Sequence, residues 1–277
     1  MEIIKTADEF VNWRSKQSDS IGFIPTLGAL HDGHMSLIKE SQKNCKITIV
    51  SIFLNPTQFS ENEDLDSYPN TRKQDIYNLN CLNVDVLFLP NETEMYQNVC
   101  DVNVPSSELF NKLEGKSRPH FFYGVTTIVA KLFNIIQPTH TFFGQKDAQQ
   151  LIIIKEMIMN MKYPITLVSC PTIRDKNGLA LSSRNNYLND NEQQQAAIIH
   201  QSLMKIKEKI NQGIFNTNEL KNIFKKNIIT NHNINIDYIS IADMKTLKEV
   251  DKIKNQKVLV STAVFFKNVR LIDNFIY

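Results

Sequence analysis

The sequence has no long hydrophobic run. Its longest apolar stretches, such as residues 47–54, fall far short of the roughly 18 consecutive apolar residues that a membrane-spanning helix needs. The N-terminus also lacks a basic region followed by an apolar one, so no secretory signal is visible. We therefore expect a protein that does not cross a membrane and that stays in the cytoplasm.

The sequence also lacks an excess of charge of one sign. It has 31 Lys plus Arg and 29 Asp plus Glu, a net charge of +2, and no block of five like charges. A phosphate backbone is bound by a basic face or stripe, so we expect no nucleic-acid partner. The four cysteines are widely separated, with no CxxC pair and no histidine at zinc spacing, which favours reduced, mostly buried thiols.

The 277 residues are enough for nearly two domains. A capping-box pattern at Thr6 and Glu9 predicts that a helix comes first. From residue 21 to about 170, short apolar runs alternate with helical stretches, which favours parallel strands joined by helical crossovers. The sequence therefore predicts an α/β fold with a Rossmann-like doubly wound parallel sheet. The expected strands are 21–25, 47–54, 84–89, 141–143 and 165–168, and the expected helices are 34–43, 71–79, 125–136 and 147–161.

The pattern changes after Pro171. Residues 192–226 are typical of helices with a break at Gly213, and residues 234–241 and 258–267 are typical of strands. We expect a first domain at 1–174 and a smaller, lid-like α+β domain at 175–277. Residues 91–119 are less regular and predict only short helical pieces.

Polar residues follow the predicted strands, at residues 25–34, 55–59, 144–150 and 174–184. In an open parallel sheet, ligands bind beyond the carboxyl ends of the strands, where such loops converge. We therefore expect these four loops to form one crevice.

The first loop combines glycines with a histidine pair. Gly28 and Gly33 allow close backbone approach, and the helix that follows presents N–H groups that favour an anion, so the loop is a candidate phosphate seat. His31 and His34 are three residues apart, and each ring offers an N–H donor and, when protonated, a charge. A histidine pair can also ligate a metal, but no third and fourth ligand follows at a recognisable spacing, and we expect no metal site.

Two common nucleotide motifs are absent, the P-loop GxxxxGK[ST] and the dinucleotide fingerprint GxGxxG. Ordinary NTPase and hydride-transfer chemistry are therefore disfavoured. Lys146 is placed to reach a phosphate, although a lysine that begins a helix is often only exposed. Ser182, Ser183 and Arg184 could close over the site as a lid, or be a capping serine pair beside a surface arginine.

Two glutamines suggest a second pocket beside the phosphate site. Gln58 and Gln150 are neutral, and each can donate and accept hydrogen bonds at once. Such side chains suit the hydroxyl or carboxylate groups of a small polar substrate.

The run Ile24-Pro-Thr-Leu-Gly-Ala-Leu-His-Asp-Gly-His-Met-Ser-Leu37 closely resembles the signature of the pantothenate synthetase (pantoate–β-alanine ligase) family. The family belongs to the nucleotidyltransferase superfamily, whose HIGH-type element is here His31-Asp-Gly-His34. The resemblance extends over residues 50–59, 131–138, 143–151, 178–185 and 270–274.

The resemblance implies a two-step ligation. Pantoate and ATP give pantoyl adenylate and pyrophosphate, and β-alanine then displaces AMP to give pantothenate. It also implies that Mg²⁺ accompanies the ATP and that the enzyme is a cytoplasmic homodimer with these small-molecule substrates.

The family's functional positions can be carried over to this sequence. We expect His31, His34, Lys146 and Arg184 to be catalytic, with His34 in the family's proton-donor position, and Gln58 and Gln150 to hold pantoate, with Gln58 also near β-alanine. The resemblance implies that ATP is held by Leu27, Gly28, Ala29, Leu30, His31, Asp32, Gly33, His34, Gly144, Gln145, Lys146, Asp147, Ile173, Leu181, Ser182, Ser183 and Arg184.

Several positions depart from the family pattern. The family often has Met at Leu27, Arg at Asn70 and Tyr at Ala148, and it commonly has His where Phe121 stands, with His120 one position earlier. We therefore leave His120 out of the expected site.

Two other functions are compatible with the first loop. One is a nucleotidyltransferase that moves AMP or CMP onto a phosphate-bearing acceptor, which we expect to lack residues 55–58 and the Gln149-Gln150 pair. The other is a nucleotide-binding regulatory protein that has lost catalysis. This alternative is disfavoured because the chain has all four of His31, His34, Lys146 and Arg184.

Overall fold

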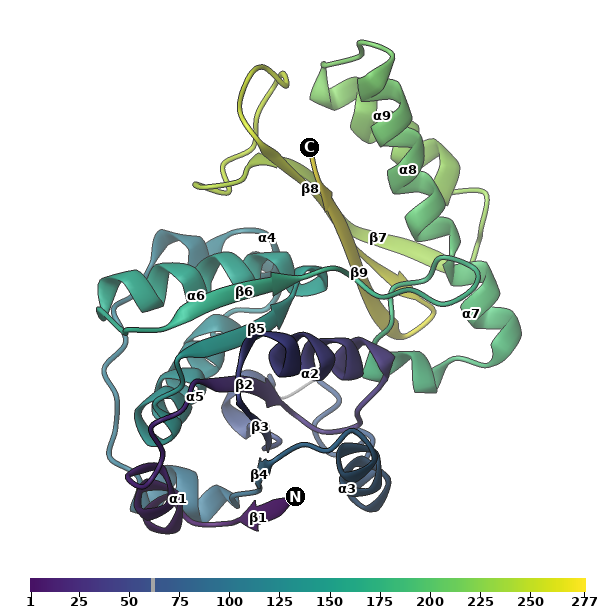
Figure 1. The fold of residues 1–277 in the computed structure, drawn as a ribbon. Helices are drawn as coiled ribbons and strands as arrows, with labels where there is room; N and C mark the ends of the chain where they lie inside the picture. The colour runs from purple at the N-terminus through teal and green to yellow at the C-terminus, as the bar shows by residue number, and fades with distance from the viewer. Residues whose placement is uncertain (61–62) are drawn as a thin grey trace.

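The larger part of the molecule is a six-stranded parallel sheet covered by helices (Figure 1). The structure is a computed structural model that describes residues 1–60 and 63–277. The strands follow the order β1-β4-β3-β2-β5-β6, and every neighbouring pair is parallel. They are β1 (Glu2–Ile4), β2 (Ile21–Thr26), β3 (Ile47–Ile52), β4 (Val86–Phe88), β5 (His140–Gly144) and β6 (Thr166–Cys170).

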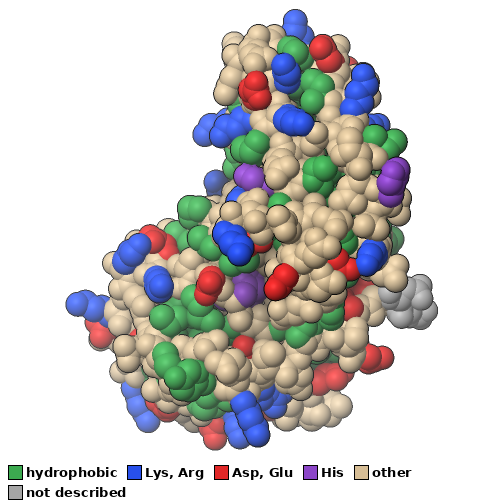
Figure 2. Space-filling view, turned by 90° about the vertical axis from the view of Figure 1, so that its right-hand side faces the viewer, with side chains coloured by type: hydrophobic (Ala, Val, Ile, Leu, Met, Phe, Trp, Pro, Cys, Tyr) green, Lys and Arg blue, Asp and Glu red, His purple; other side chains and the backbone are tan. Residues whose placement is uncertain are grey.

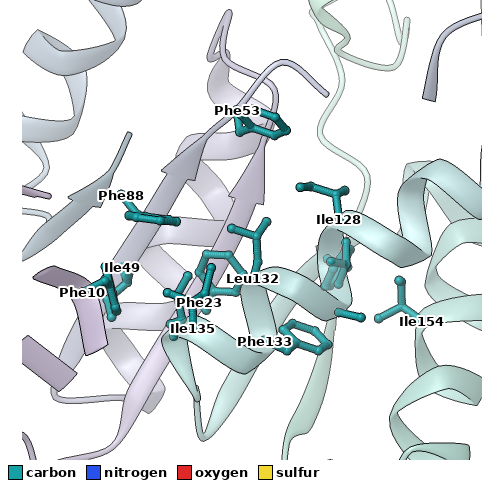
Figure 3. Packing of buried hydrophobic residues seen from close by; sticks show 14 of the residues in the cluster. Phe10, Phe23, Ile49, Phe53, Phe88, Ile128, Leu132, Phe133, Ile135 and Ile154 are labelled. Carbon is teal, nitrogen blue, oxygen red and sulfur yellow. The ribbon is translucent and has the colours of Figure 1, made fainter. Parts of the chain in front are cut away.

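Both faces of this sheet are buried, because successive strand residues point to opposite sides. Phe23 and Ile49 belong to the apolar core on one face (Figure 3), and Ile24 and Val50 belong to the core on the other. The fold is therefore the predicted α/β doubly wound sheet. One core contains residues of α1 (Ala7–Arg14), α5 (Phe121–Ile136) and α6 (Ala148–Asn160), and the other contains residues of α2 (Asp32–Asn44) and α3 (Arg72–Cys81).

The start of the chain corrects one prediction. A helix does not come first, because the short strand β1 precedes α1 and pairs with β4. Only Ile4 of this edge strand is buried, so its sequence carries no readable period. Half of the predicted capping box is confirmed: the Thr6 hydroxyl accepts a hydrogen bond from the Glu9 N–H at 3.3 Å. The Glu9 carboxylate does not complete the box, because it accepts from the Lys5 N–H instead of the Thr6 N–H.

The irregular segment at 91–119 contains short helical pieces, as expected. They are a π-helical turn at Glu94–Asn98, a 3₁₀ turn at Glu108–Asn111 and α4 (Leu113–Ser117). The fully buried Lys131 of α5 donates to the carbonyl of Met95 at 2.9 Å, which ties the first piece to the sheet part.

The C-terminal part is a three-stranded antiparallel sheet with helices and a core of its own (Figure 1). Its helices are α7 (Asp190–Ala196), α8 (Ile198–Asn211) and α9 (Thr217–Ile228), and its strands are β7 (Ile234–Asp243), β8 (Val258–Phe266) and β9 (Val269–Ile276). Gly213, at a φ of 92°, follows α8 at the predicted break. Strand β9 was not predicted. In the described residues, no helix has the length and apolar character to span a membrane.

Candidate active site

A cleft of about 860 Å³ opens where the loops after β2, β3 and β5 meet the strands of the C-terminal part. Figure 2 shows charged side chains of both signs and a histidine near the waist between the broad sheet part and the narrower C-terminal part. The predicted loops therefore converge. Of the predicted site residues, Leu27, His31, His34, Gln58, Gly144, Lys146, Asp147, Gln150, Ser182, Ser183 and Arg184 line the cleft, and Gly28, Ala29, Leu30, Asp32, Gly33, Gln145, Ile173 and Leu181 are not among its lining residues.

The two histidines form a capping box at the start of α2. The His31 Nδ1 accepts from the Gly33 N–H at 3.1 Å, and the His34 Nδ1 accepts from the His31 N–H at 3.3 Å. Because each Nδ1 accepts a backbone proton, each ring carries its own proton on Nε2. The ring centroids are 4.1 Å apart.

Both imidazoles are neutral at physiological pH. Burial lowers the pKa of His31 to about 4, with the charge of Lys146 as a further cause. Burial, then His31 and then Lys146, hold the pKa of His34 well below its usual value. Of the two contributions that a histidine can make, an N–H donor and a charge when protonated, each ring therefore offers the neutral N–H donor at this pH.

The loop after β2 is held by a buried carboxylate that sequence analysis missed. Asp75 of α3 is 2% exposed and accepts from the N–H groups of Ala29 at 3.0 Å and Leu30 at 2.9 Å. It supports a backbone with positive φ at Gly28 (93°) and Ala29 (50°). The Gly28 N–H in turn donates to the Thr26 hydroxyl. These three N–H groups are bonded within the protein, so they fix the shape of the loop that leads to His31.

Lys146 lies on the 3₁₀ turn Gln145–Asp147 that follows β5. Its side chain is 18% exposed and its Nζ lies 3.7 Å from the Asp147 carboxylate. Both residues line the cleft together with the two histidines. The lysine is therefore an amine directed at the site, and the alternative of a fully exposed surface lysine does not hold.

Arg184 is engaged with a carboxylate. Its guanidinium forms two hydrogen bonds to Asp64, at 2.9 and 2.6 Å. The Ser182 hydroxyl accepts from the Arg184 N–H, as in the capping alternative, while the buried Ser183 hydroxyl donates to the Ala29 carbonyl at 3.0 Å. The segment is thus bonded to the loop after β2, and Arg184 is neither free nor on the outer surface.

Gln58 is oriented by a buried amide network. The fully buried Asn55 accepts from the Thr57 N–H through Oδ1 and donates through Nδ2 to the Gly124 carbonyl at 3.1 Å, so its orientation is set by the backbone. The same Nδ2 donates to the Gln58 Oε1 at 3.3 Å. Within the described residues the Gln58 Nε2 has no protein partner, so this end can donate to a bound acceptor. The tyrosine hydroxyl of Tyr96 also donates to Asn55.

The positions that depart from the family pattern have structural partners of their own. Phe121 lines the cleft, and the Arg118 guanidinium lies 3.7 Å from its ring centroid. His120, at a φ of 70°, precedes α5 and lines a side pocket next to the cleft. Ala148 is buried in the cleft wall, and Asn70 is exposed.

The C-terminal strands supply lining residues that sequence analysis did not single out. Arg270 forms hydrogen bonds to Glu114 of α4 and to Asp237 of β7, and the Tyr238 hydroxyl donates to Glu114 at 2.6 Å. Other polar or charged lining residues from these strands include Ser261, Thr262, Asp273 and Asn274. Residues 270–274 are part of the family resemblance, and this resemblance is the only feature of the sequence noted above that points to them as site residues.

The model of the Pantoate-beta-alanine ligase family matches residues 2–276. This chain belongs to the pantoate–β-alanine ligase family. It is 43% identical to the pantothenate synthetase of Fervidobacterium nodosum, covering 100% of this chain and 99% of that protein, and 42% identical to that of Acetivibrio thermocellus, covering 100% and 99%.

Solved structures of the family have the same fold. The pantothenate synthetase of Thermus thermophilus superposes with a TM-score of 0.91 at 32% identity and covers 99% of both chains. The pantoate-beta-alanine ligase of Francisella tularensis, in complex with beta-gamma ATP and beta-alanine, superposes with a TM-score of 0.76 at 36% identity and covers 99% of this chain and 97% of that one.

Proposed function

We propose that this pantoate–β-alanine ligase carries out its reaction in the cleft in two steps. First, the pantoate carboxylate attacks the α-phosphate of ATP, and pyrophosphate leaves. Then the amine of β-alanine attacks the acyl carbon of pantoyl adenylate, AMP leaves with the bonding electron pair, and pantothenate forms. The amine's proton goes to solvent or to the departing phosphate.

The first step needs little proton chemistry, because a carboxylate is ionised at neutral pH. It needs positioning and stabilisation of the charge that develops on the phosphate oxygens. In our proposal, Lys146 supplies the positive charge, and the Nε2–H groups of His31 and His34 donate hydrogen bonds. The largely buried Lys146, whose side chain is 18% exposed, already supplies a positive charge at this site. The neutral histidines can therefore contribute hydrogen bonds without adding a second charge beside it.

Gln58 and Gln150 are proposed to hold pantoate. Both line the cleft, and the Asn55 network leaves the Nε2 donor of Gln58 for the carboxylate or hydroxyl oxygens of that substrate. Arg184 is proposed to take part in holding the phosphates, where it would exchange its carboxylate partner Asp64 for an equally anionic one.

The lining fits a magnesium ion that arrives with ATP. The described residues include no group of three or more His, Cys, Asp or Glu arranged to hold a metal by themselves. Mg²⁺ commonly takes one or two carboxylates together with substrate phosphates and water. Asp147, which is 47% exposed in its side chain, would hold it here, and the ion would neutralise part of the triphosphate charge.

The observation that carries the proposal is the convergence of Lys146, both histidines and both glutamines on one cleft. The test is pantoate-dependent formation of AMP and pyrophosphate from ATP. We expect His34→Ala and Lys146→Ala each to lower this rate by about a hundredfold or more, the loss typical of one preorganised electrostatic group. Lys43→Ala, at a lysine 70% exposed on α2, is the matched control. Near wild-type pyrophosphate release from the Lys146 or His34 variant would contradict the assignment.

We also propose that residues 1–174 and 175–277 act as two domains, with the second as a lid, and that the enzyme is a cytoplasmic homodimer. The two separate apolar cores support the division into two domains. The family resemblance supports the homodimer and the cytoplasmic location. Sedimentation at micromolar concentration tests the dimer, since a single species of 31.9 kDa would contradict it.

A further inference from the structure

Asn274 of β9 makes all three of its side-chain hydrogen bonds to the turn that carries Lys146. Its Nδ2 donates to the carbonyls of Gln145 at 3.0 Å and Lys146 at 2.8 Å, and its Oδ1 accepts from the Gln145 Nε2 at 3.1 Å. Two carbonyl acceptors require an N–H₂ group, so the orientation of the amide is determined. Asn274 is 5% exposed, and a hydrogen bond that a buried polar group fails to make is costly.

The turn is a short connection between β5 and α6. Gln145–Asp147 is a single 3₁₀ turn, and the preceding Gly144 provides no side-chain cap. The bonds from Asn274 bridge 128 and 129 positions of sequence, from the C-terminal sheet to the end of β5. The carbonyls that Asn274 bonds belong to Lys146 itself and to the residue before it, so its amide restrains the backbone from which the lysine side chain extends.

The strand that carries Asn274 is itself anchored. The neighbouring Asp273 is 3% exposed and forms two hydrogen bonds to the Arg174 guanidinium, at 2.6 and 2.8 Å. Arg174 also donates to the Gly178 carbonyl, so the pair connects β9 to the segment that leads from β6 into the C-terminal part. Asn274 is therefore attached to a fixed point on its own side of the cleft.

We propose that Asn274 is a positioning residue for Lys146 in the adenylation step. This inference rests on the proposed function, in which the Lys146 amine contacts the phosphates of ATP, because Asn274 would act by placing that amine. The Asn274 amide, through its bonds to the two carbonyls, sets the position of the Lys146 backbone. A residue of the C-terminal sheet thereby helps to place a catalytic group that follows a strand of the N-terminal sheet. A misplacement of about 1 Å of a catalytic group costs on the order of a hundredfold in rate.

The test is a double-mutant cycle between Asn274 and Lys146, measured as pantoate-dependent pyrophosphate release by the full-length enzyme. We expect Asn274→Ala to lower kcat by about 10- to 100-fold with a much smaller change in the KM for pantoate. In the Lys146→Ala background, the same substitution should lower the remaining rate by less than about threefold, because a residue that acts through the lysine has nothing left to position.

Asn274→Asp gives a second, near-isosteric variant. It keeps an oxygen at Oδ1 but directs another oxygen at two carbonyl oxygens, so it should lower kcat at least as much as Asn274→Ala. If Asn274→Ala does not fold, Asn274→Asp replaces it in the double-mutant cycle with Lys146→Ala. Thr217→Val is the matched control, because it removes a buried bond from a side chain to the Val250 carbonyl in the same part of the molecule, away from the cleft. Thermal unfolding of each variant confirms that rates are measured on folded protein.

The outcomes separate the two proposals. Equal losses from the Asn274 substitution in the wild-type and Lys146→Ala backgrounds would overturn the positioning role, because the asparagine would then act independently, for example by touching substrate. A wild-type rate for folded Asn274→Ala and Asn274→Asp would overturn it as well. A wild-type rate for Lys146→Ala would instead overturn the proposed function, and the inference about Asn274 with it.

Discussion

Substitution of the buried Asp75 by Asn tests whether this carboxylate holds the histidine loop. The Asp75 Oδ1 accepts from the Leu30 N–H and from the Thr71 hydroxyl at 3.1 Å, and Oδ2 accepts from the Ala29 N–H. An asparagine can keep its oxygen at the first position. It then turns an N–H₂ group toward the Ala29 N–H, so one charged bond is lost and a buried donor is left without an acceptor.

The magnitude follows from these bonds. A hydrogen bond to a charged group contributes about 1.5–3 kcal/mol, and an unsatisfied buried donor costs about 1–3 kcal/mol. The loop also holds Ala29 at a φ of 50°, a left-handed conformation that costs about 1–2 kcal/mol for a residue with a Cβ. The two hydrogen-bond figures describe the loss at the same Ala29 N–H, so they overlap and are not added. We expect Asp75→Asn to lower the free energy of unfolding by about 1.5–3 kcal/mol if the loop stays in place.

If the loop relaxes instead, the free energy of unfolding falls less and the adenylation rate falls more. Ala29 would leave its strained conformation, and the capping box of His31 and His34, two residues further on, would shift with it. The adenylation rate should then fall by about a hundredfold, while the loss of stability is smaller.

Both quantities are measured on the same variant, by denaturant unfolding and by pantoate-dependent pyrophosphate release. Glu40→Gln, which makes the same exchange at a carboxylate on the surface of α2, is the control and should change the unfolding free energy by less than about 1 kcal/mol. An unchanged free energy of unfolding together with an unchanged rate in Asp75→Asn would show that the carboxylate does not hold the loop.

Two further predictions concern pH and the pantoate side of the cleft. Because the pKa of His31 is lowered to about 4 and that of His34 is also lowered, the unfolded chain takes up protons below about pH 6.5 while the folded one does not, so stability should fall from pH 6.5 toward 4. Unfolding of His31→Gln should show a weaker fall, and an identical pH dependence would contradict the neutral ring. In Gly124→Ala, the new Cβ would lie 2.3 Å from the Thr57 carbonyl oxygen and displace the turn that carries Gln58, so the KM for pantoate should rise about tenfold or more. Gly213→Ala is the control, because it strains a backbone with a φ of 92° that is not part of the cleft lining. Equal KM values in the two variants would contradict the mechanism.

The sheet and its loops could be predicted because the signal is local. Strands such as β2 and β3 are buried on both faces, so their apolar runs are continuous, and the polar loops directly follow them. Parallel pairing then brings the ends of those strands to one edge. On this basis the sequence could assign five polar residues to one cleft, namely Lys146, His31, His34, Gln58 and Gln150.

The remaining features depend on partners that are distant in sequence. Asp75 lies 46 positions from Ala29, and Asn274 lies 129 from Gln145, so no local pattern connects them. The strand β1 has three residues and obtains its order from pairing with β4. The protonation of the histidines depends on burial and on Lys146, which only the assembled cleft brings beside them.

The charge balance of the cleft bears on how ATP can be held. Arg184 is paired with Asp64, Arg118 with Glu63, and both histidines are neutral, so several groups that could attract a triphosphate are already compensated. Arg184 can bind a phosphate only by giving up or sharing its carboxylate, an exchange between two anions whose net gain is smaller than the Coulomb attraction of a free guanidinium. In the proposed mechanism, binding strength therefore comes chiefly from Lys146, from a cation that accompanies the nucleotide, and from neutral N–H donors. These attract a phosphate over short distances, which agrees with a chain whose formal net charge is only +2.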